Sequence, residues 1–308
     1  MEKTNLTLLY AFEGFEKDLS EELSLRRARV LERQGRLFVV EDLSSRPAWA
    51  QVHGAHAIKA SPKSITESAK FLRNLGGKWA CASQTLHRRS QLIQEQASRT
   101  RPVPEIEFLG KVPAGHWGIW ALLNESTLIA SAETDSVFPL GEVKIKESEE
   151  PPSRAYMKLW ELFTLYGIKP SSGARTIDLG SSPGGWTWVL AELGCKVVAV
   201  DKAPLAPNLA KNPSVKSLKK DAFKLSPAEV GAIDWLFSDL ICYPPKLFDL
   251  VQIWREAGVK NFVCTLKFQG LSDFESMARF LEIPGSWIVH LCANKHEVTW
   301  VCLEKGKN

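Results

Sequence analysis

A glycine-rich loop between Asp178 and Trp186 is the part of the sequence best suited to bind a small molecule. It reads Asp-Leu-Gly-Ser-Ser-Pro-Gly-Gly-Trp and stands between an apolar run and a helical segment. Its glycines permit a tight turn and a close backbone approach to a ligand; they are Gly180, Gly184 and Gly185. Asp201 follows Gly180 by 21 residues, where an acidic side chain can accept from two ribose hydroxyls. The pattern predicts a nucleotide-like ligand, and an ordinary glycine-rich turn is the alternative.

The residues of this loop exclude some classes of nucleotide ligand. The loop is not the G-x-G-x-x-G of a dinucleotide site, and no Lys-Ser/Thr follows its glycines as in a P-loop. Asp178 at its head suits a cationic amino-acid group better than a pyrophosphate. Ser182 and Pro183 complete the loop and are candidate contacts of the same ligand. Trp186 either contacts the ligand or packs at the junction between sheet and helix.

The loop resembles the S-adenosylmethionine loop of the FtsJ-like ribose 2'-O-methyltransferases. That family carries a Lys-Asp-Lys-Glu tetrad, which this chain matches in order with Lys158, Asp239, Lys267 and Glu297. The resemblance implies an α/β fold, a Rossmann-like methyltransferase domain with a mainly parallel, doubly wound sheet. It also implies S-adenosyl-L-methionine as cofactor and catalytic roles for the four tetrad residues. Two structural ion pairs are the alternative role for these four. From the spacing of cysteines and histidines we expect no metal.

Further motifs are similar to those of the bacterial 23S rRNA 2'-O-ribose methyltransferase M family. They are Pro-Gly-Gly-Trp-Thr, the Pro-Ser-Arg before Lys158, and Gly-Phe-Glu-Lys at residues 14–17. The similarity runs from about Pro151 to Leu303, and it covers the shorter N-terminal half only in outline. It implies a THUMP-like N-terminal region and a cytidine of 23S ribosomal RNA as the target. The RNA would be naked or part of an assembling pre-50S particle, with no obligate protein partner.

The tetrad makes chemical sense for methyl transfer to a ribose. A 2'-hydroxyl is a weak acid, so it must be positioned in line with the methyl donor, and a nearby base must accept its proton. Lys267 could be that base if part of it is neutral. Asp239 and Glu297 favour its ammonium form, whereas burial and the second cation, Lys158, favour the amine. The sequence leaves this balance open.

Three further carboxylate and hydroxyl groups are candidate cofactor contacts. Asp221 follows the third strand, where similar enzymes bind the adenine amino group; a helix N-cap or a solvated turn is its alternative role. Ser153 is a weaker candidate, because it is better placed to cap the helix that carries Lys158. Asp239 belongs to both sets, since it ends a strand at the predicted cofactor edge.

A basic stretch runs from Lys59 to Arg101, with nine basic and two acidic residues and a local charge excess of +7. The basic residues are Lys59, Lys63, Lys70, Arg73, Lys78, Arg88, Arg89, Arg99 and Arg101. Such charge favours phosphate contacts, and aromatic residues such as Trp79 can stack on unpaired bases. We expect this stretch to bind RNA, and a solvated basic face is the alternative.

The order of predicted strands and helices divides the chain at residues 147–153, where a polar run meets two prolines. We expect a small α+β unit at 1–58, the THUMP-like RNA-binding region at 59–148, and the Rossmann-like domain at 151–308. In the first two, we expect strands at 8–12 and 37–41, helices at 15–25 and 64–75, and a hairpin at 117–132.

After the seam, predicted strands alternate with helices, which is typical of a parallel, doubly wound sheet. The strands are expected at 176–179, 196–201, 235–239, 262–266, 287–291 and 298–303, and the helices at 187–193, 247–257 and 273–280. The last two strands have a short link and should pair antiparallel.

Composition excludes several classes of protein. The chain has 308 residues, 44% of them hydrophobic and 24% charged, values typical of a globular protein of about two domains. Its six cysteines contain no C-x-x-C pair, and we see no early signal peptide, which favours a reducing, cytoplasmic location. No apolar run is long enough to span a membrane. His53 and His56 have no partner at metal-ligand spacing.

Two other functions remain to be weighed against a ribose methyltransferase. A base methyltransferase would normally carry Asn-Pro-Pro-Tyr/Phe or a catalytic cysteine after the fourth or sixth strand. Here the fourth strand runs into Ser-Asp-Leu-Ile-Cys242, which disfavours that class. A catalytically silent RNA-binding protein is the second alternative, and the complete tetrad and glycine loop argue against it.

Overall fold

The computed structural model of the chain describes residues 4–98, 103, 105–108 and 110–304. It forms two compact units, one of residues 1–106 and 111–144, the other of residues 107–110 and 145–308. Residues 1–58 thus share a unit with most of residues 59–148. The division falls a few residues before the predicted seam, because the chain around residue 144 still pairs with Ile106 of the first unit. The second unit carries the glycine loop and the tetrad.

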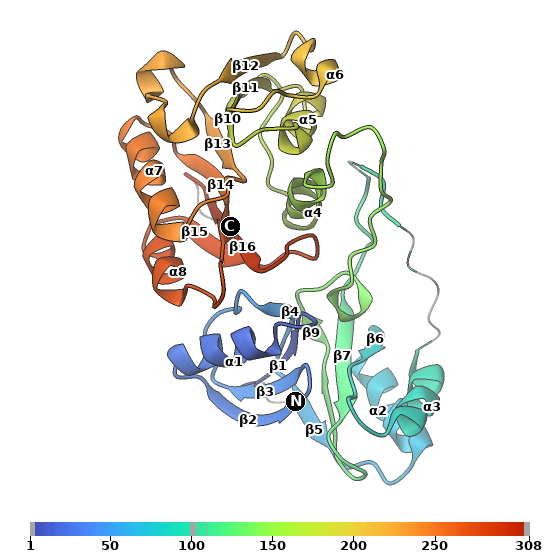
Figure 1. Cartoon of the computed structure of the whole chain (residues 1–308). Coiled ribbons are helices and arrows are strands. Elements are labelled where there is room, and N and C mark those ends of the chain that lie inside the picture. The colour runs from blue at the N-terminus through green and yellow to red at the C-terminus, as the bar shows by residue number, and fades with distance from the viewer. Residues whose placement is uncertain (1–3, 99–102, 104, 109, 305–308) are drawn as a thin grey trace. The chain divides into compact units, whose positions relative to one another are not determined.

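Two sheets form the described part of the first unit (Figure 1). The five-stranded sheet has the order β2-β3-β1-β4-β9, with β1 at Leu6–Ala11, β2 at Arg29–Gln34, β3 at Leu37–Glu41, β4 at Ala50–Ala55 and β9 at Glu133–Thr134. The four-stranded sheet has the order β5-β8-β7-β6, with β5 at Ile58–Ala60, β6 at Lys78–Cys81, β7 at Trp117–Leu122 and β8 at Leu128–Ser131. The helices are α1 at Glu16–Leu25, α2 at Ile65–Leu75 and α3 at His87–Ala97.

The core beside the four-stranded sheet explains why α2 and α3 form where they do. Apolar residues of both helices pack with Trp79 and Trp120 in one buried cluster. Ser64 caps α2, because its side chain accepts a hydrogen bond from the backbone of Glu67. Trp79 is 0% exposed, so the expectation that it stacks on RNA bases was wrong. Its ring instead packs in the buried cluster between the helices and the sheet.

The second unit contains a seven-stranded sheet of order β12-β11-β10-β13-β14-β16-β15. The strands are β10 at Arg175–Leu179, β11 at Lys196–Asp201, β12 at Val215–Lys219, β13 at Trp235–Ser238, β14 at Asn261–Lys267, β15 at Ser286–Val289 and β16 at Glu297–Cys302. The first five are parallel, and β16 pairs antiparallel with both β14 and β15, which confirms the predicted mixed sheet.

Helices cover both faces of this sheet, with α4 and α5 on one side and α7 and α8 on the other (Figure 1). Their bounds are Tyr156–Tyr166 for α4, Gly185–Glu192 for α5, Pro244–Glu256 for α7 and Phe274–Leu281 for α8. A short α6 spans Pro207–Ala210, and the 3-10 helices are η1 at Pro139–Gly141, η2 at Ala222–Lys224 and η3 at Pro227–Glu229. No helix among the described residues is long and apolar enough to cross a membrane.

Strand order places the predicted site at one edge of the sheet. From β10 the chain proceeds outward through β11 and β12, then returns to β13 on the other side of β10. Such a reversal leaves a crevice at the carboxyl ends of the two central strands, where ligands of open α/β sheets bind. The glycine loop leaves β10 at this point, and Asp239 directly follows β13.

Candidate active site

The glycine loop turns tightly because its glycines adopt conformations that other residues resist. Gly180 has φ +82° and Gly184 has φ +121°, both in the region that favours glycine. A Cβ atom added to Gly184 would lie 2.3 Å from Leu209 Cδ1, and one added to Gly185 would lie 2.4 Å from Ser153 Oγ. The loop therefore packs closely against its neighbours and accepts no larger side chain at these positions without moving them.

Asp178 lies at the head of the loop with an unsatisfied oxygen. Its side chain is 1% exposed; Oδ2 accepts a hydrogen bond from Thr187 Oγ1 at 2.6 Å. Oδ1 is buried without a hydrogen-bond partner among the described residues. Burial, together with the charges of Asp239 and Asp201, raises the pKa of Asp178 to about 7 against the Thr187 hydrogen bond. A cationic ligand group beside Oδ1 would relieve both the missing partner and the cost of ionisation.

Asp201 ties the end of β11 to the loop. Its Oδ2 accepts from the backbone N–H of Ser182 at 3.0 Å, and its Oδ1 accepts from that of Ala203 at 2.9 Å. Each carboxylate oxygen can accept more than one hydrogen bond, so Asp201 still has capacity for ribose hydroxyls. The carbonyl of Pro183 accepts from Ala206 N–H, which fixes the far side of the loop.

The orphaned Asp178 oxygen and the tight glycine turn fit S-adenosylmethionine, whose amino-acid end carries an ammonium group and whose adenosine carries a ribose. The side chains that would hold it are those of Asp178 and Asp201, with the backbone of residues 180–185 alongside. The donor would supply a methyl group on a sulfonium centre. The remaining chemistry depends on residues of this chain.

The four tetrad side chains, Lys158, Asp239, Lys267 and Glu297, form one connected cluster. Lys158 Nζ lies 3.0 Å from Asp239 Oδ1 and 2.6 Å from Glu297 Oε1. Lys267 Nζ lies 2.9 Å from Asp239 Oδ1 and donates to the Asp239 carbonyl oxygen at 2.8 Å. The alternative of two separate ion pairs does not describe this arrangement, because Asp239 bridges both lysines.

Backbone register explains how distant residues meet in this cluster. Lys267 is the last residue of β14 and Glu297 the first of β16, and the antiparallel pairing sets them directly opposite each other. Asp239 comes from the neighbouring parallel strand β13, and Lys158 reaches the cluster from α4. Lys267 is the most accessible of the four, with a side chain 20% exposed against 10% for Lys158.

The charges of the cluster favour a protonated Lys158. Burial lowers the pKa of this lysine, but Asp239 and Glu297 outweigh burial, and the net pKa is raised above its ordinary value. Lys158 therefore stays cationic at neutral pH. A fixed cation at this position can hold Asp239 in place but cannot accept a proton.

Three candidate contacts have other roles in the structure as well. We had expected Ser153 to cap α4, and this expectation was wrong. Ala155 occupies the N-cap position, in a helical conformation. Trp186 is 3% exposed and its Nε1 donates to the Ala155 carbonyl, which favours the packing role. Asp221 caps η2 through Phe223 N–H and pairs with Lys202 at 2.9 Å; this lysine lowers the Asp221 pKa.

Glu161 is a site residue that the sequence analysis missed. It lies on α4, one turn after Lys158, and is 2% exposed. Its carboxylate accepts from the backbone N–H groups of Cys292 at 2.9 Å and Ala293 at 3.2 Å. These residues belong to the connection from β15 to Glu297, so Glu161 joins the helix of Lys158 to the segment that carries Glu297. A glutamate among mostly apolar residues, one turn after Lys158, was the signal available in the sequence.

The buried Glu161 should make stability depend on pH. Burial raises its pKa from 4.5 to about 7 against the two backbone hydrogen bonds. Its contribution to stability is therefore full below pH 4.5 and is lost as pH rises toward 7. We expect the free energy of unfolding of wild type, relative to Glu161→Gln, to fall by on the order of 3 kcal/mol across this window. Denaturant titrations at several pH values measure it.

Glu229→Gln is the matched control for this prediction. A hydrogen bond from Lys220 and one from Ser226 N–H lower the pKa of Glu229, so this residue is already ionised above pH 5. Its variant should show no slope relative to wild type between about pH 5 and 7. Equal slopes in the two variants would contradict the assignment to Glu161.

The basic stretch of the first unit is accessible where the structure describes it. Lys59, Lys63, Lys70, Arg73, Lys78 and Arg88 are exposed and Arg89 is half-buried, whereas Arg99 and Arg101 lie outside the described residues. Among the described residues, no group of three or more His, Cys, Asp or Glu side chains is placed to hold a metal ion. His53 is half-buried, and burial lowers its pKa.

The sheet, the glycine loop at its central reversal and the adjoining lysine-carboxylate cluster define a Rossmann-like domain of the S-adenosylmethionine-dependent methyltransferase class. Residues 151–308 match the family model described as FtsJ-like methyltransferase. The chain belongs to this family, and the predicted resemblance is confirmed.

Comparison with curated proteins gives relatives with one shared name, "Ribosomal RNA large subunit methyltransferase M". The relative from Shewanella frigidimarina is 28% identical over 72% of this chain and 64% of its own length. The relative from Shewanella halifaxensis is 29% identical over 80% of this chain and 73% of its own length. That from Xanthomonas oryzae pv. oryzae (strain PXO99A) is 30% identical over 71% and 61%. The chain spans less than two thirds of the first and third of these proteins.

Proposed function

We propose that this protein transfers a methyl group from S-adenosylmethionine to a ribose 2'-hydroxyl of RNA. The observation that carries the proposal is the connected cluster of Lys158, Asp239, Lys267 and Glu297 beside the glycine loop. The shared name of the relatives supports ribosomal RNA of the large subunit as the substrate. We propose a cytidine of 23S ribosomal RNA as the target, free or in an assembling pre-50S particle, and a cytoplasmic site of action.

In this proposal Lys267 Nζ accepts the proton of the 2'-hydroxyl. With the donor bound, its methyl–sulfur bond would break as the 2'-oxygen bonds the methyl carbon, and the sulfur would leave as a neutral thioether while Lys267 holds the proton. Lys267 suits this role because its side chain is the most accessible of the cluster and lies at the carboxyl edge of the sheet. The Asp239 carbonyl and carboxylate both accept from Nζ and so fix its direction.

The other three cluster residues position Lys267 in this proposal. Lys158 stays cationic and neutralises Asp239 and Glu297 at 3.0 and 2.6 Å. The cation of Lys158 therefore holds both carboxylates in place, and Asp239 in turn holds Lys267 Nζ through their ion pair.

We propose that residues 59–148, which carry the accessible basic stretch, are a THUMP-like region that delivers the RNA. Its role is supported by the exposure of six of the described basic side chains. Phosphate contacts from such a surface give affinity without sequence preference and weaken as salt is added.

A base methyltransferase that uses Cys242 as nucleophile is less well supported. Burial raises the pKa of the Cys242 thiol, although Lys246 and Lys267 oppose this effect. A thiol that is hard to ionise is a poor nucleophile. A silent RNA-binding protein is also less well supported, since such a protein would not need four charged side chains gathered at a cofactor edge.

The proposed function is tested by mapping 2'-O-methylation across ribosomal RNA in a strain that lacks the gene. We expect one nucleotide of 23S ribosomal RNA to lose its 2'-O-methyl group and to regain it with the wild-type gene but not with Lys267→Ala. An unchanged 2'-O-methylation pattern together with a lost base methylation would overturn ribose as the target. No lost methylation of either kind would support the silent binding protein.

A further inference from the structure

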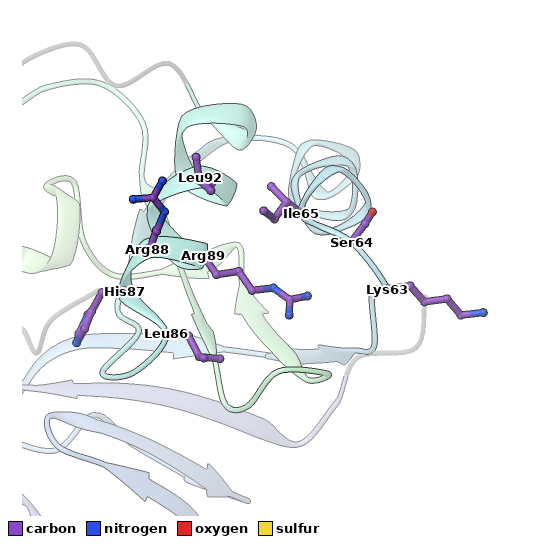
Figure 2. A pocket seen from close by; sticks show the side chains of 8 residues that line it. All are labelled: Lys63, Ser64, Ile65, Leu86, His87, Arg88, Arg89 and Leu92. Atoms are coloured by element: carbon purple, nitrogen blue, oxygen red, sulfur yellow. The ribbon is translucent and has the colours of Figure 1, made fainter.

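An open depression of about 680 Å³ lies on the surface between α2 and α3 of the first unit, far in sequence from the glycine loop. We call it the α2–α3 pocket. Its lining residues are Lys63, Ser64, Ile65, Leu86, His87, Arg88, Arg89 and Leu92. The volume falls within the range of about 300–1,000 Å³ that is typical of small-molecule sites. Figure 2 shows Arg89 extending from α3 toward the start of α2, where Ile65 lies.

The start of α3 lacks several features that normally stabilise the N-terminus of a helix. Its N-cap is Leu86, which has a left-handed conformation with φ 54° and makes no side-chain capping bond. Left-handed backbone is strained for a leucine, and leucine is a poor N-cap. The first turn, His87 to Arg89, has no acidic residue and two arginines, although the helix dipole favours negative charge there. Each feature costs stability, and a bound anion would offset them together.

The backbone N–H groups that are available to a ligand in this pocket belong to α3 rather than to α2. At α2, Ser64 accepts from Glu67 N–H at 3.1 Å and Glu67 accepts from Lys63 N–H at 2.7 Å, so this helix start is capped. At α3, the first amide that bonds within the helix is that of Ser90, which donates to the Leu86 carbonyl. The amides of residues 87–89 precede it and need an acceptor from elsewhere.

Arg89 provides the second, independent indication of a ligand. Its Nε atom is buried and has no hydrogen-bond partner within the described part of the chain. An arginine donor buried without an acceptor is costly, and a phosphate oxygen is an acceptor that its planar fork matches well. The orphaned donor lies in the same pocket as the uncapped helix start.

The remaining walls of the pocket are apolar. Ile65, Leu86 and Leu92 line it, and Leu92 is 37% exposed. Apolar side chains beside an anion site suit a ligand with a flat, weakly polar part attached to a phosphate. A nucleotide has this composition, whereas inorganic phosphate would leave the apolar walls without a contact.

We propose that the α2–α3 pocket binds one unpaired nucleotide of single-stranded RNA, with its phosphate at Arg89 and the first turn of α3. The base packs against Ile65, Leu86 and Leu92. The choice of RNA rests on the proposed function. The nucleotide must be unpaired because a base stacked within a duplex cannot turn its face to these apolar side chains.

The test is the affinity of the full chain for a short, labelled single-stranded RNA of mixed sequence, measured by fluorescence anisotropy at fixed salt. We expect Arg89→Ala to weaken binding at least about tenfold and to reduce the slope of log K against log salt by about 0.7, the value for one phosphate contact on a single strand. Arg89→Lys should restore part of the affinity, because it keeps the charge but not the fork. Lys17→Ala is the matched control, because Lys17 is an exposed cation on α1, outside both the basic stretch and the pocket lining.

Two outcomes would overturn the inference. One is equal affinity of Arg89→Ala and Lys17→Ala for RNA, with both proteins folded by circular dichroism. The other is equal affinity of wild type for the RNA and for a matched strand of abasic ribose phosphates, which would mean that the site takes an anion only. Neither measurement uses methyl transfer. RNA binding through Arg89 by a protein that methylates no RNA would contradict the proposed function and leave this inference in place.

Discussion

Replacing Lys267 with alanine should lower the rate of methyl transfer at least about 10²-fold, the low end for the loss of a general base. Binding of S-adenosylmethionine and of RNA should remain, because the glycine loop and the basic stretch are unchanged. Single-turnover transfer of a radiolabelled methyl group to the RNA substrate measures this effect, and calorimetry measures cofactor binding.

Two further variants separate proton transfer from simple placement of charge. Lys267→Arg should not restore the rate, since a guanidinium stays protonated and cannot accept a proton. Lys260→Ala is the control, because Lys260 is an exposed lysine at the opposite end of β14, paired with Glu304. Near wild-type turnover in Lys267→Arg would mean that the cation only positions the substrate, and would leave the methyltransferase proposal intact.

Gly185→Val should weaken S-adenosylmethionine binding by at least about tenfold, or roughly 1.4 kcal/mol. An added Cβ would lie 2.4 Å from Ser153 Oγ and 3.2 Å from both Ser153 O and Tyr156 N. Because two of these atoms are backbone, the side chain cannot be accommodated by a rotamer change alone. Either the loop or the start of α4 must move, and each movement disturbs the cofactor edge. Isothermal titration calorimetry with the methyl donor measures the effect.

Gly231→Val is the matched control for the loop substitution. Gly231 has φ +77°, so valine there is strained, but an added Cβ meets no heavy atom within 4 Å. This variant should lose stability without losing affinity for the cofactor. Asp201→Ala should also weaken binding, since it removes the acceptor of Ser182 N–H along with the proposed ribose contact. Wild-type affinity in both Gly185→Val and Asp201→Ala would place the cofactor elsewhere.

The sequence was informative wherever one local pattern determines one structure. The alternation of strands and helices after residue 175 predicted the mixed sheet, because most of its strands are short apolar runs that are largely buried. The mostly exposed β12 was not among the six expected strands. By contrast, β2 was missed: it is an edge strand of mostly charged and exposed residues, and it forms through its pairing with β3. An exposed strand stabilised by its neighbour carries little signal of its own.

By itself, therefore, the sequence established the glycine loop, the order of the tetrad residues and the family resemblance, since these depend on residue type and spacing. The tertiary structure decided which charges meet. It set Lys267 opposite Glu297 through strand register, made Asp239 a bridge between two lysines, and brought Glu161 to the amides of residues 292 and 293. It also buried Trp79 and left Arg89 without an acceptor. Burial and pairing depend on residues far apart in the chain, and no local pattern specifies the distance between them.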